Sequence, residues 1–399
     1  MRLLEGIRVL DLTNVLADPF CCYQLATLGA DVIKVEVPGT GDLARELGAD
    51  PLLNKRRMGT SFLAQNAGKR SITLNLKSAA GKKVFQRLVG TAQVVVENFR
   101  PGVMHRLGLG YEQLRQHNPS LVYCAISGFG QDGPMKDAPA YDQIIQGLSG
   151  AMSITGDGRR APLRVGYPFA DTLGGITAAF AIAGALMRRT KTGEGSFIDV
   201  SMLDSALASM GWVISNYLIA GQEPLPMGND NFTAAPSGAF KTGNGLLNIA
   251  ANKQEQFEAL ATVIGRKDLI TDPRFADRED RKRHRAALTR EVEAALRSKS
   301  AVEWEMTLIA VGIPAGRVVT VPEALENPQV KHRQLLQGFD TVPGVGRPIS
   351  VTRAGFKISG ANPAAKSPPP RLGEHTEEAL RGLGYSPAEI AELRKTRAI

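Results

Sequence analysis

One carboxylate of the chain stands where a nucleophile could act. Asp171 lies in Val165-Gly-Tyr-Pro-Phe-Ala-Asp-Thr-Leu-Gly-Gly175, before a long Ala-rich segment that is predicted to be helical. The first amides and the positive end of such a helix would stabilise charge that develops at the carboxylate. Asp171 is therefore a candidate covalent nucleophile. The structural alternative is that it only caps the helix, a contribution of about 1 kcal/mol.

Other well-known catalytic motifs are missing or incomplete. Gly39-Thr-Gly-Asp-Leu-Ala44 follows the second predicted strand and lacks the acidic partner of a dinucleotide site. Gly68-Lys-Arg-Ser71 resembles the end of a P-loop, but Leu63 stands where its first glycine is required. The five histidines form no i, i+4 pair, and no G-x-S-x-G elbow occurs. We expect no metal site, dinucleotide site or nucleotide hydrolysis.

Composition indicates a globular protein that binds an anionic small molecule. The 399 residues are 43% hydrophobic, and the formal net charge is +9, with 48 basic residues interleaved with 39 acidic ones. Charge alone would also fit nucleic acid, yet the densest basic run, Arg278 to Arg285, contains two acidic residues and no aromatic one. The three cysteines are too few for a disulfide framework and are expected to be buried small hydrophobes. With no apolar stretch of ~18 to 20 residues and no signal peptide pattern, we expect a cytoplasmic protein with no membrane partner.

The elements that would position Asp171 alternate between strand and helix. Strands are predicted at 7–12, 31–36, 72–76, 93–97, 121–126 and 196–200, and helices at 18–28, 79–90, 111–117, 176–187 and 202–218. Repeated β-α-β units predict a doubly wound, Rossmann-like parallel sheet. In the first helix, Asp18 and Pro19 are interpreted as N-cap and first helical residue.

Composition changes divide the chain into domains. Residues 1–220 are expected to form the first part of a large α/β domain, and 225–330 a smaller, mostly helical α+β domain. Residues 331–399 are expected to return to the large domain through a β-rich segment at 341–359, a Pro-rich connector at 363–370 and terminal helices at 375–394.

Six motifs in order along the chain resemble one family. They are Leu4-Glu-Gly-Ile-Arg-Val-Leu-Asp-Leu12, Gly29-Ala-Asp-Val-Ile-Lys-Val-Glu36, Gly68-Lys-Arg-Ser-Ile-Thr-Leu-Asn75, Val96-Glu-Asn-Phe-Arg-Pro-Gly102, Ser127-Gly-Phe-Gly-Gln-Asp-Gly-Pro134 and Leu372-Gly-Glu-His-Thr376. Together they look like the class III CoA-transferases of the CaiB/BaiF type, which include formyl-CoA transferase, carnitine CoA-transferase and succinyl-CoA-dependent enzymes. The resemblance covers almost the whole chain.

The resemblance implies a covalent mechanism. Asp171 matches the catalytic aspartate of the family, which attacks an acyl-CoA to give a mixed anhydride and then an aspartyl-CoA thioester. Asp142 would support the site, and the amides of Gly174 and Gly175 are candidate donors to the oxyanions. The family also implies an interlocked homodimer.

Coenzyme A is the expected substrate and product, and no metal is expected. By resemblance, the CoA-contacting residues are Leu16, Ala17, Leu74, Asn75, Lys77, Asn98, Phe99, Arg100, Arg106 and Tyr141. Lys77, Arg100 and Arg106 would face phosphates. The chain departs from formyl-CoA transferase at Leu16 and Val37, where that enzyme has glutamine and arginine, which counts against oxalate as acceptor.

The substrate is a hypothesis, and other functions stay open. Arg164, or its neighbours Arg159 and Arg160, could hold the far carboxylate of a dicarboxylic acyl group such as succinyl; solvated loop arginines are the alternative. Racemases related to this family have a histidine where Tyr141 stands, and tyrosine is a poor proton carrier at neutral pH, so transfer is favoured over racemisation. A non-catalytic CoA-binding protein and a nucleic-acid binder are further alternatives.

Overall fold

The computed structural model describes residues 2–360 and 363–399, which form two compact units. The sheet unit comprises the segments up to Ala151, Arg164–Gln222 and Arg333–Ile399; the small unit comprises Met152–Leu163 and Glu223–His332. The excursion Met152–Leu163 differs from the continuous segment 1–220 that we expected for the large domain.

A six-stranded parallel sheet organises the sheet unit. Its strands are β1 (Arg8–Asp11), β2 (Asp31–Glu36), β3 (Lys69–Thr73), β4 (Val94–Glu97), β5 (Val122–Ser127) and β6 (Ser196–Ser201). They are arranged in the order β3-β2-β1-β4-β5-β6. This order confirms the predicted doubly wound sheet. Only β3 is shifted from its predicted range, because Lys69 and Ser71 are buried polar residues that interrupt the apolar pattern.

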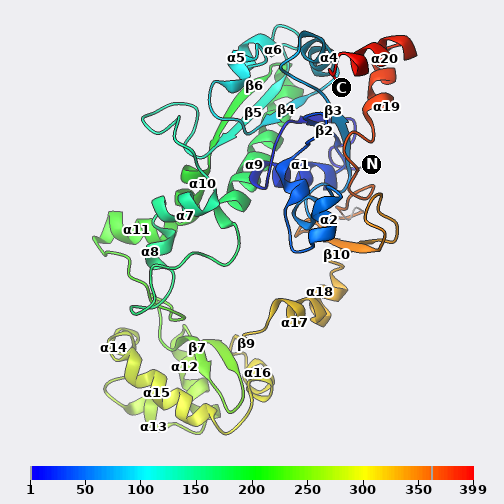
Figure 1. The fold of residues 1–399 in the computed structure, drawn as a ribbon. Coiled ribbons are helices and arrows are strands. Elements are labelled where there is room, and N and C mark those ends of the chain that lie inside the picture. Colours follow the sequence, from blue (N-terminus) through cyan, green and yellow to red (C-terminus); the bar gives the residue numbers. More distant parts are fainter. Residues whose placement is uncertain (1, 361–362) are drawn as a thin grey trace. The chain divides into compact units, whose positions relative to one another are not determined.

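Alternate residues of each strand face opposite sides of this sheet, and helices cover both sides (Figure 1). Val9, Val32 and Val94 pack against α1 (Ala17–Thr27), α9 (Phe169–Thr192) and α10 (Met202–Ser209). Leu10, Ile33 and Val95 pack against α4 (Ala79–Val89), α6 (Tyr111–Leu114), α19 (Thr376–Gly382) and α20 (Pro387–Lys395). The cysteines Cys21, Cys22 and Cys124 are all buried on the α1 side, as expected.

Shorter elements complete the sheet unit. They are η1 (Leu43–Glu46), α2 (Pro51–Lys55), α3 (Thr60–Leu63), α5 (Val103–Arg106), α7 (Asp142–Leu148), α11 (Gly211–Ala220) and the antiparallel pair β10 (Leu336–Phe339) and β11 (Ile349–Thr352). A further short helix, α8 (Ala151–Ile154), spans the boundary between the units.

The small unit has its own core around a three-stranded antiparallel sheet. Strands β7 (Ser237–Lys241), β8 (Leu246–Ala250) and β9 (Ala315–Arg317) pack with α12 (Gln254–Val263), α15 (Arg285–Leu296) and α16 (Ala301–Ala310). The remaining helices are α13 (Asp268–Thr271), α14 (Arg278–Arg283), α17 (Val321–Glu326) and α18 (Pro328–His332). Sequence reasoning did not find these three strands, which are short and rich in glycine at their ends.

Helix α9 is longer and more apolar than expected. It has 24 residues and contains an 18-residue window of mean hydropathy 1.5, so by length and composition alone it could cross a membrane, a test that core helices also pass. It packs on α1 and the sheet through Ala178, Ile182 and Leu186. Its Ile176, Phe180 and Met187 are exposed, and every residue of α11 is unburied.

Candidate active site

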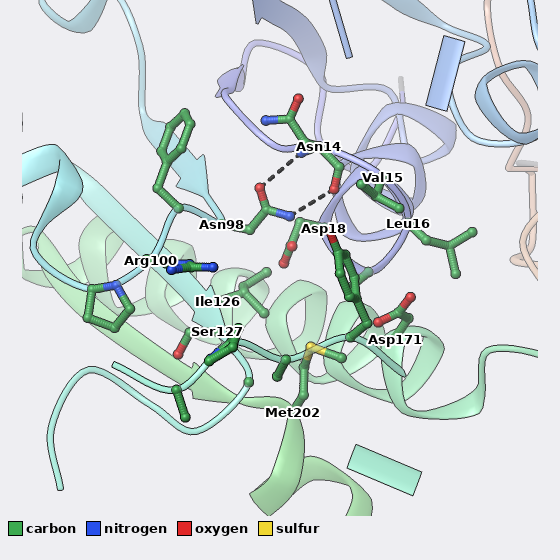
Figure 2. A pocket seen from close by; sticks show the side chains of 18 of the residues that line it. Asn14, Val15, Leu16, Asp18, Asn98, Arg100, Ile126, Ser127, Asp171 and Met202 are labelled. Atoms are coloured by element: carbon green, nitrogen blue, oxygen red, sulfur yellow. Dashed lines mark hydrogen bonds between the residues drawn. The ribbon is translucent and has the colours of Figure 1, made fainter. Parts of the chain in front are cut away.

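A pocket of about 270 Å³ opens at the carboxyl ends of β1 and β4 (Figure 2). These strands are neighbours at the point where the strand order reverses, which is where open α/β sheets bind ligands. The loops that follow β1, β4 and β5 line the pocket together with the start of α9. The lining residues are Asn14, Val15, Leu16, Ala17, Asp18, Asn98, Phe99, Arg100, Pro101, Ile126, Ser127, Gly128, Lys136, Ala138, Pro139, Ala140, Tyr141, Asp171 and Met202.

Two of these loops are tied together by reciprocal hydrogen bonds. The Asn14 backbone amide donates to Asn98 Oδ1 at 2.9 Å, and Asn98 Nδ2 donates to the Asn14 carbonyl at 2.8 Å (Figure 2). The next residue, Val15, has a φ of 70°, a left-handed conformation that is strained for a β-branched side chain. Such strain persists only where the surroundings hold it, so the loop is a built feature of the pocket.

A buried ion-pair network lies beside this loop and holds it in place. We use that name for Asp11, Lys34, Glu36, Asp42, Arg45 and Lys69.

Both ends of the loop are bonded to this network. Lys34 Nζ donates to the Thr13 carbonyl at 2.7 Å, and Lys69 Nζ donates to the Pro19 carbonyl at 2.9 Å. Asp42 Oδ1 accepts from the strained Val15 amide at 2.9 Å. The ionic groups therefore fix the backbone on both sides of Asp18 without entering the pocket themselves.

Asp171 reaches the pocket from the first turn of α9. The helix begins at Phe169 and its N-cap position is Pro168, so Asp171 lies inside the helix and is not its N-cap. Among the described residues, its carboxylate has no hydrogen-bond partner. Burial raises the pKa of Asp171 to about 7, and the charge of Asp142 adds to the effect. A poorly solvated carboxylate of this kind is reactive once it is ionised.

Asp142 supports the start of α9. Its Oδ1 accepts from the Ala170 amide at 2.9 Å, and its Oδ2 accepts from Gln146 Nε2 at 2.7 Å. Gln146 in turn accepts from the Val165 amide at 2.8 Å. These bonds satisfy a free amide of the first helical turn and fix the segment that leads into Asp171.

Gly174 and Gly175 have a packing role in the structure. Both lie in the second turn of α9, where amides bond to carbonyls of the preceding turn, and neither lines the pocket. A Cβ on Gly175 would stand 2.3 Å from the Ala17 carbonyl oxygen, and one on Gly174 would stand 3.1 Å from Met202 Cγ. The glycines let α9 approach α1 and α10, so the oxyanion role that we predicted for their amides has no geometric support.

A second carboxyl, Asp18, lies in the same pocket and was missed as a site residue. Helix α1 begins at Ala17 with Leu16 at the N-cap position, so the N-cap reading of Asp18 was wrong. Its side chain is 2% exposed, and its Oδ1 is buried without a hydrogen-bond partner among the described residues. Burial raises the pKa of Asp18 well above its usual range, the charge of Asp171 raises it further, and a hydrogen bond with Asn98 opposes the rise.

The pocket is cationic at its exposed mouth and has carboxyl groups deeper inside. Arg100, Lys136 and Tyr141 are exposed, while the carboxyls of Asp18 and Asp171 lie deeper. Lys136 was not predicted, because nothing in its exposed loop distinguishes it from a solvated lysine. A ligand with a phosphate-rich end and a reactive uncharged end fits this gradient.

The structure brings only part of the predicted CoA set together. Leu16, Ala17, Asn98, Phe99, Arg100 and Tyr141 line the pocket with Asp171. Leu74 is a buried core residue, Lys77 and Arg106 are exposed, and these three lie outside the pocket. Asn75 also lies outside, where its backbone amide donates to the Ala398 carbonyl at 2.8 Å.

The predicted substrate arginines do not line the pocket either. Arg164 Nε donates to the neighbouring Val165 carbonyl at 3.3 Å, and its side chain is exposed. Arg159 and Arg160 belong to the small unit, where their backbone amides donate to Asp157. The distal-carboxylate role of these arginines remains a prediction.

Comparison with known proteins identifies the family. Residues 4–376 match CoA-transferase family III, and the chain belongs to this family. It is 36% identical over 394 residues to mouse succinyl-CoA:glutarate CoA-transferase, covering 98% of this chain and 89% of that protein. It is 40% identical over 349 residues to acetyl-CoA:oxalate CoA-transferase of Acetobacter aceti, covering 87% and 89%.

A solved structure has the same fold. A CaiB/BaiF family protein from Brucella suis superimposes with a TM-score of 0.83 at 35% identity, covering 96% of this chain and 100% of the other. The protein is therefore a CoA-transferase whose substrates are CoA thioesters.

Proposed function

We propose that the protein moves CoA from succinyl-CoA to a carboxylic or dicarboxylic acid through covalent intermediates on Asp171. The observation that carries the proposal is the position of this carboxylate in a pocket at the switch point of the sheet. Asp171 is half-buried and has no hydrogen-bond partner among the described residues, and the cations that line the pocket lie at its mouth. Of the three expected phosphate-binding residues, Arg100 lines this cavity together with Asp171, and Lys136 adds a second cation.

The expected chemistry uses this geometry directly. The Asp171 carboxylate attacks the thioester carbonyl, which gives an acyl-aspartyl anhydride and CoA thiolate. The thiolate returns to the aspartyl carbonyl, releases the donor acid and leaves an aspartyl-CoA thioester. An acceptor carboxylate then repeats both steps in reverse. Arg100 and Lys136 would hold the phosphates at the mouth while the thioester extends inward.

The identity of the acids is supported by relatives rather than by a visible subsite. Relatives are named for succinyl-CoA with glutarate, D-citramalate and mesaconate. The relative named for oxalate is 40% identical, although Leu16 and Val37 count against oxalate here. We therefore place a dicarboxylate of four or five carbons first among the acceptors to be measured.

We also propose that the protein works as a homodimer. Phe180 is 81% exposed on α9, and Trp212 and Ile219 are 71% and 85% exposed on α11. Exposed apolar residues in such number mark an interaction surface on a soluble protein. A second copy of the chain is the proposed partner, and sedimentation equilibrium with Phe180→Asp and Ile219→Asp variants tests it: a wild-type monomer would contradict the proposal.

Trapping tests the covalent step. The protein is incubated with succinyl-CoA, treated with hydroxylamine or borohydride and digested, and Asp171 is examined by mass spectrometry. We expect modification at Asp171 that increases as the pH rises through about 7, because the ionised carboxylate is the nucleophile. Absence of any adduct with a panel of acyl-CoA donors would contradict the mechanism. α-Deuterium uptake into the acyl group in D2O without an adduct would instead favour racemisation.

A further inference from the structure

The pocket contains a buried carboxyl, Asp18, that has no role in the transfer mechanism proposed for Asp171 alone. Asp18 Oδ1 is buried, has no hydrogen-bond partner among the described residues, and belongs to a side chain that lines the pocket with Asp171. Figure 2 shows Asp18 and Asp171 entering this pocket from α1 and α9 respectively. A buried polar atom without a partner is costly, by roughly 1 to 3 kcal/mol, and needs an explanation.

We propose that Asp18 is the general acid and base for the CoA sulfur, a role that rests on the transfer function proposed above. In the first step the Asp171 oxygen bonds to the thioester carbon, the carbon–sulfur bond breaks, and the proton of neutral Asp18 passes to the departing sulfur. The products are the acyl-aspartyl anhydride, the CoA thiol and an Asp18 carboxylate.

The next step restores the proton. The Asp18 carboxylate takes the proton from the thiol as the sulfur attacks the aspartyl carbonyl carbon. A carbon–sulfur bond forms, the carbon–oxygen bond to the acyl group breaks, and the donor acid leaves as its carboxylate. Asp18 is again neutral, so the cycle needs no outside acid, base or oxidant.

The charges around the pocket explain why the sulfur needs a proton. A free thiolate formed beside the Asp171 anhydride would have no buried cation to pair with, because the pocket's cations, Arg100 and Lys136, are exposed at the mouth. An unpaired buried anion is strongly disfavoured. A thiol has a pKa of about 8.5, so a carboxyl whose pKa is raised well above its usual range approaches the match that efficient proton transfer requires.

The groups that face Asp18 keep its proton in place. Its charged or titratable neighbours on the surrounding elements are Asp171 on α9, Glu97 at the end of β4, Asp11 on β1, Cys21 on α1 and Cys124 on β5. Lys34 and Lys69 neutralise Asp11, and none of the other neighbours is cationic. The surroundings therefore favour the neutral form of Asp18 while Asp171 is ionised.

The matched experiment compares Asp18→Asn with the wild type on two truncated donors. The N-acetylcysteamine thioester of succinate has a basic alkanethiol leaving group, and the S-phenyl thioester has an acidic one that leaves without a proton. Both lack the nucleotide, so differences in CoA binding cancel. The rate of Asp171 modification is followed by rapid quench and mass spectrometry.

We expect Asp18→Asn to slow modification by the alkyl thioester roughly 100-fold and to leave the phenyl thioester nearly unaffected, because only the first leaving group needs the acid. The alkaline decline in the wild-type rate should also disappear in the variant. Equal slowing with both donors, or no slowing with either, would overturn the role. No adduct in the wild type would instead overturn the proposed transfer function.

Two controls separate chemistry from folding. Asn has the shape and charge of neutral Asp18, so the variant should keep the wild-type circular dichroism spectrum and its affinity for CoA. If it does not fold, Asp18→Ser repeats the comparison with a smaller neutral side chain. Asp199→Asn removes a partly exposed carboxylate of β6 outside the pocket and should leave both rates unchanged.

Discussion

The fold gives two groups of carboxyls opposite surroundings, although one member of each, Asp11 and Asp18, stands near the other in the sequence. In the ion-pair network, Asp11 Oδ2 lies 2.8 Å from Lys69 Nζ, and Lys34 Nζ lies 2.9 Å from Asp42 Oδ2. Burial alone would raise the pKa of Asp11, but Lys34 and Lys69 outweigh it and lower the pKa to about 2. No cation of the described residues pairs with Asp18 or Asp171, and their pKa values are raised.

The difference separates structure from chemistry. The paired carboxylates stay ionised, and together with their lysine partners they hold the loop backbone in place. The pKa of Asp171 is raised to about 7 and that of Asp18 well above its usual range, toward the range in which acids, bases and nucleophiles of enzymes operate. An aspartate therefore stays ionised and supports the backbone where a lysine pairs with it, and has a raised pKa where no cation among the described residues lies beside it.

The largest effect is expected from Asp171→Asn. Without the nucleophile, CoA transfer should fall by on the order of 10⁴-fold, and no hydroxylamine adduct should form at this position. The variant should nevertheless fold and be at least as stable as the wild type at pH 8, because an unpaired carboxylate with a raised pKa destabilises the folded state there. Steady-state assay and urea unfolding measure the two effects; residual transfer within tenfold of wild type would contradict the nucleophile.

The next largest effect is expected from Lys69→Met, which breaks the paired cluster. Asp11 would lose its closest cation and the Pro19 carbonyl its donor, so the free energy of unfolding should fall by about 3 to 5 kcal/mol. Urea denaturation at pH 7 measures the loss. Arg115→Met, which removes the exposed pair with Glu112, is the control and should change stability by about 0 to 1 kcal/mol. Equal losses in both variants would remove the distinction between the clusters.

The sequence predicted the sheet better than the pocket. Val9, Leu10, Val32 and Ile33 alternate between two buried faces, and such apolar runs between short loops specify strands without reference to the rest of the chain. The strand order and the location of a ligand site at the strand ends follow from the parallel connection of these units.

The chemistry of Asp18 could not be predicted in this way. An aspartate followed by proline at a helix start has the pattern of a cap, and only the three-dimensional structure shows that Asp18 lines the pocket and that its Oδ1 is buried without a partner among the described residues. The available signal was the position of a carboxylate in the loop after the first strand, at the edge where ligands bind. The ion pairs that Lys34 and Lys69 form with Asp11 could not be predicted either, because Asp11 lies 23 residues from Lys34 and 58 residues from Lys69 in the sequence.

A smaller effect, opposite in sign to that of Lys69→Met, is expected from Asp18→Asn. The unfolded chain releases the Asp18 proton near pH 4, whereas the folded protein keeps it to a higher pH. Wild-type stability is therefore lost as pH rises through this interval, and the variant does not share the loss. Its stability relative to the wild type should therefore increase as the pH rises above about 4. A difference that does not change with pH would show that Asp18 is ionised in the folded protein.

The smallest effect is expected from Asn98→Ala, which removes a neutral support of the same pocket. The Asn14 amide and carbonyl would each lose a partner, but both can be rehydrated from the pocket, so stability should fall by only about 1 kcal/mol. Because the loop that lines the proposed CoA site is loosened, the KM for succinyl-CoA should rise roughly tenfold while kcat falls less. Asn118→Ala removes two bonds donated to backbone carbonyls and two accepted from Ser120, all outside the pocket, and should cost at least as much stability without changing KM. If both variants changed the KM alike, the Asn14–Asn98 link would only stabilise the fold and would have no specific role in the pocket.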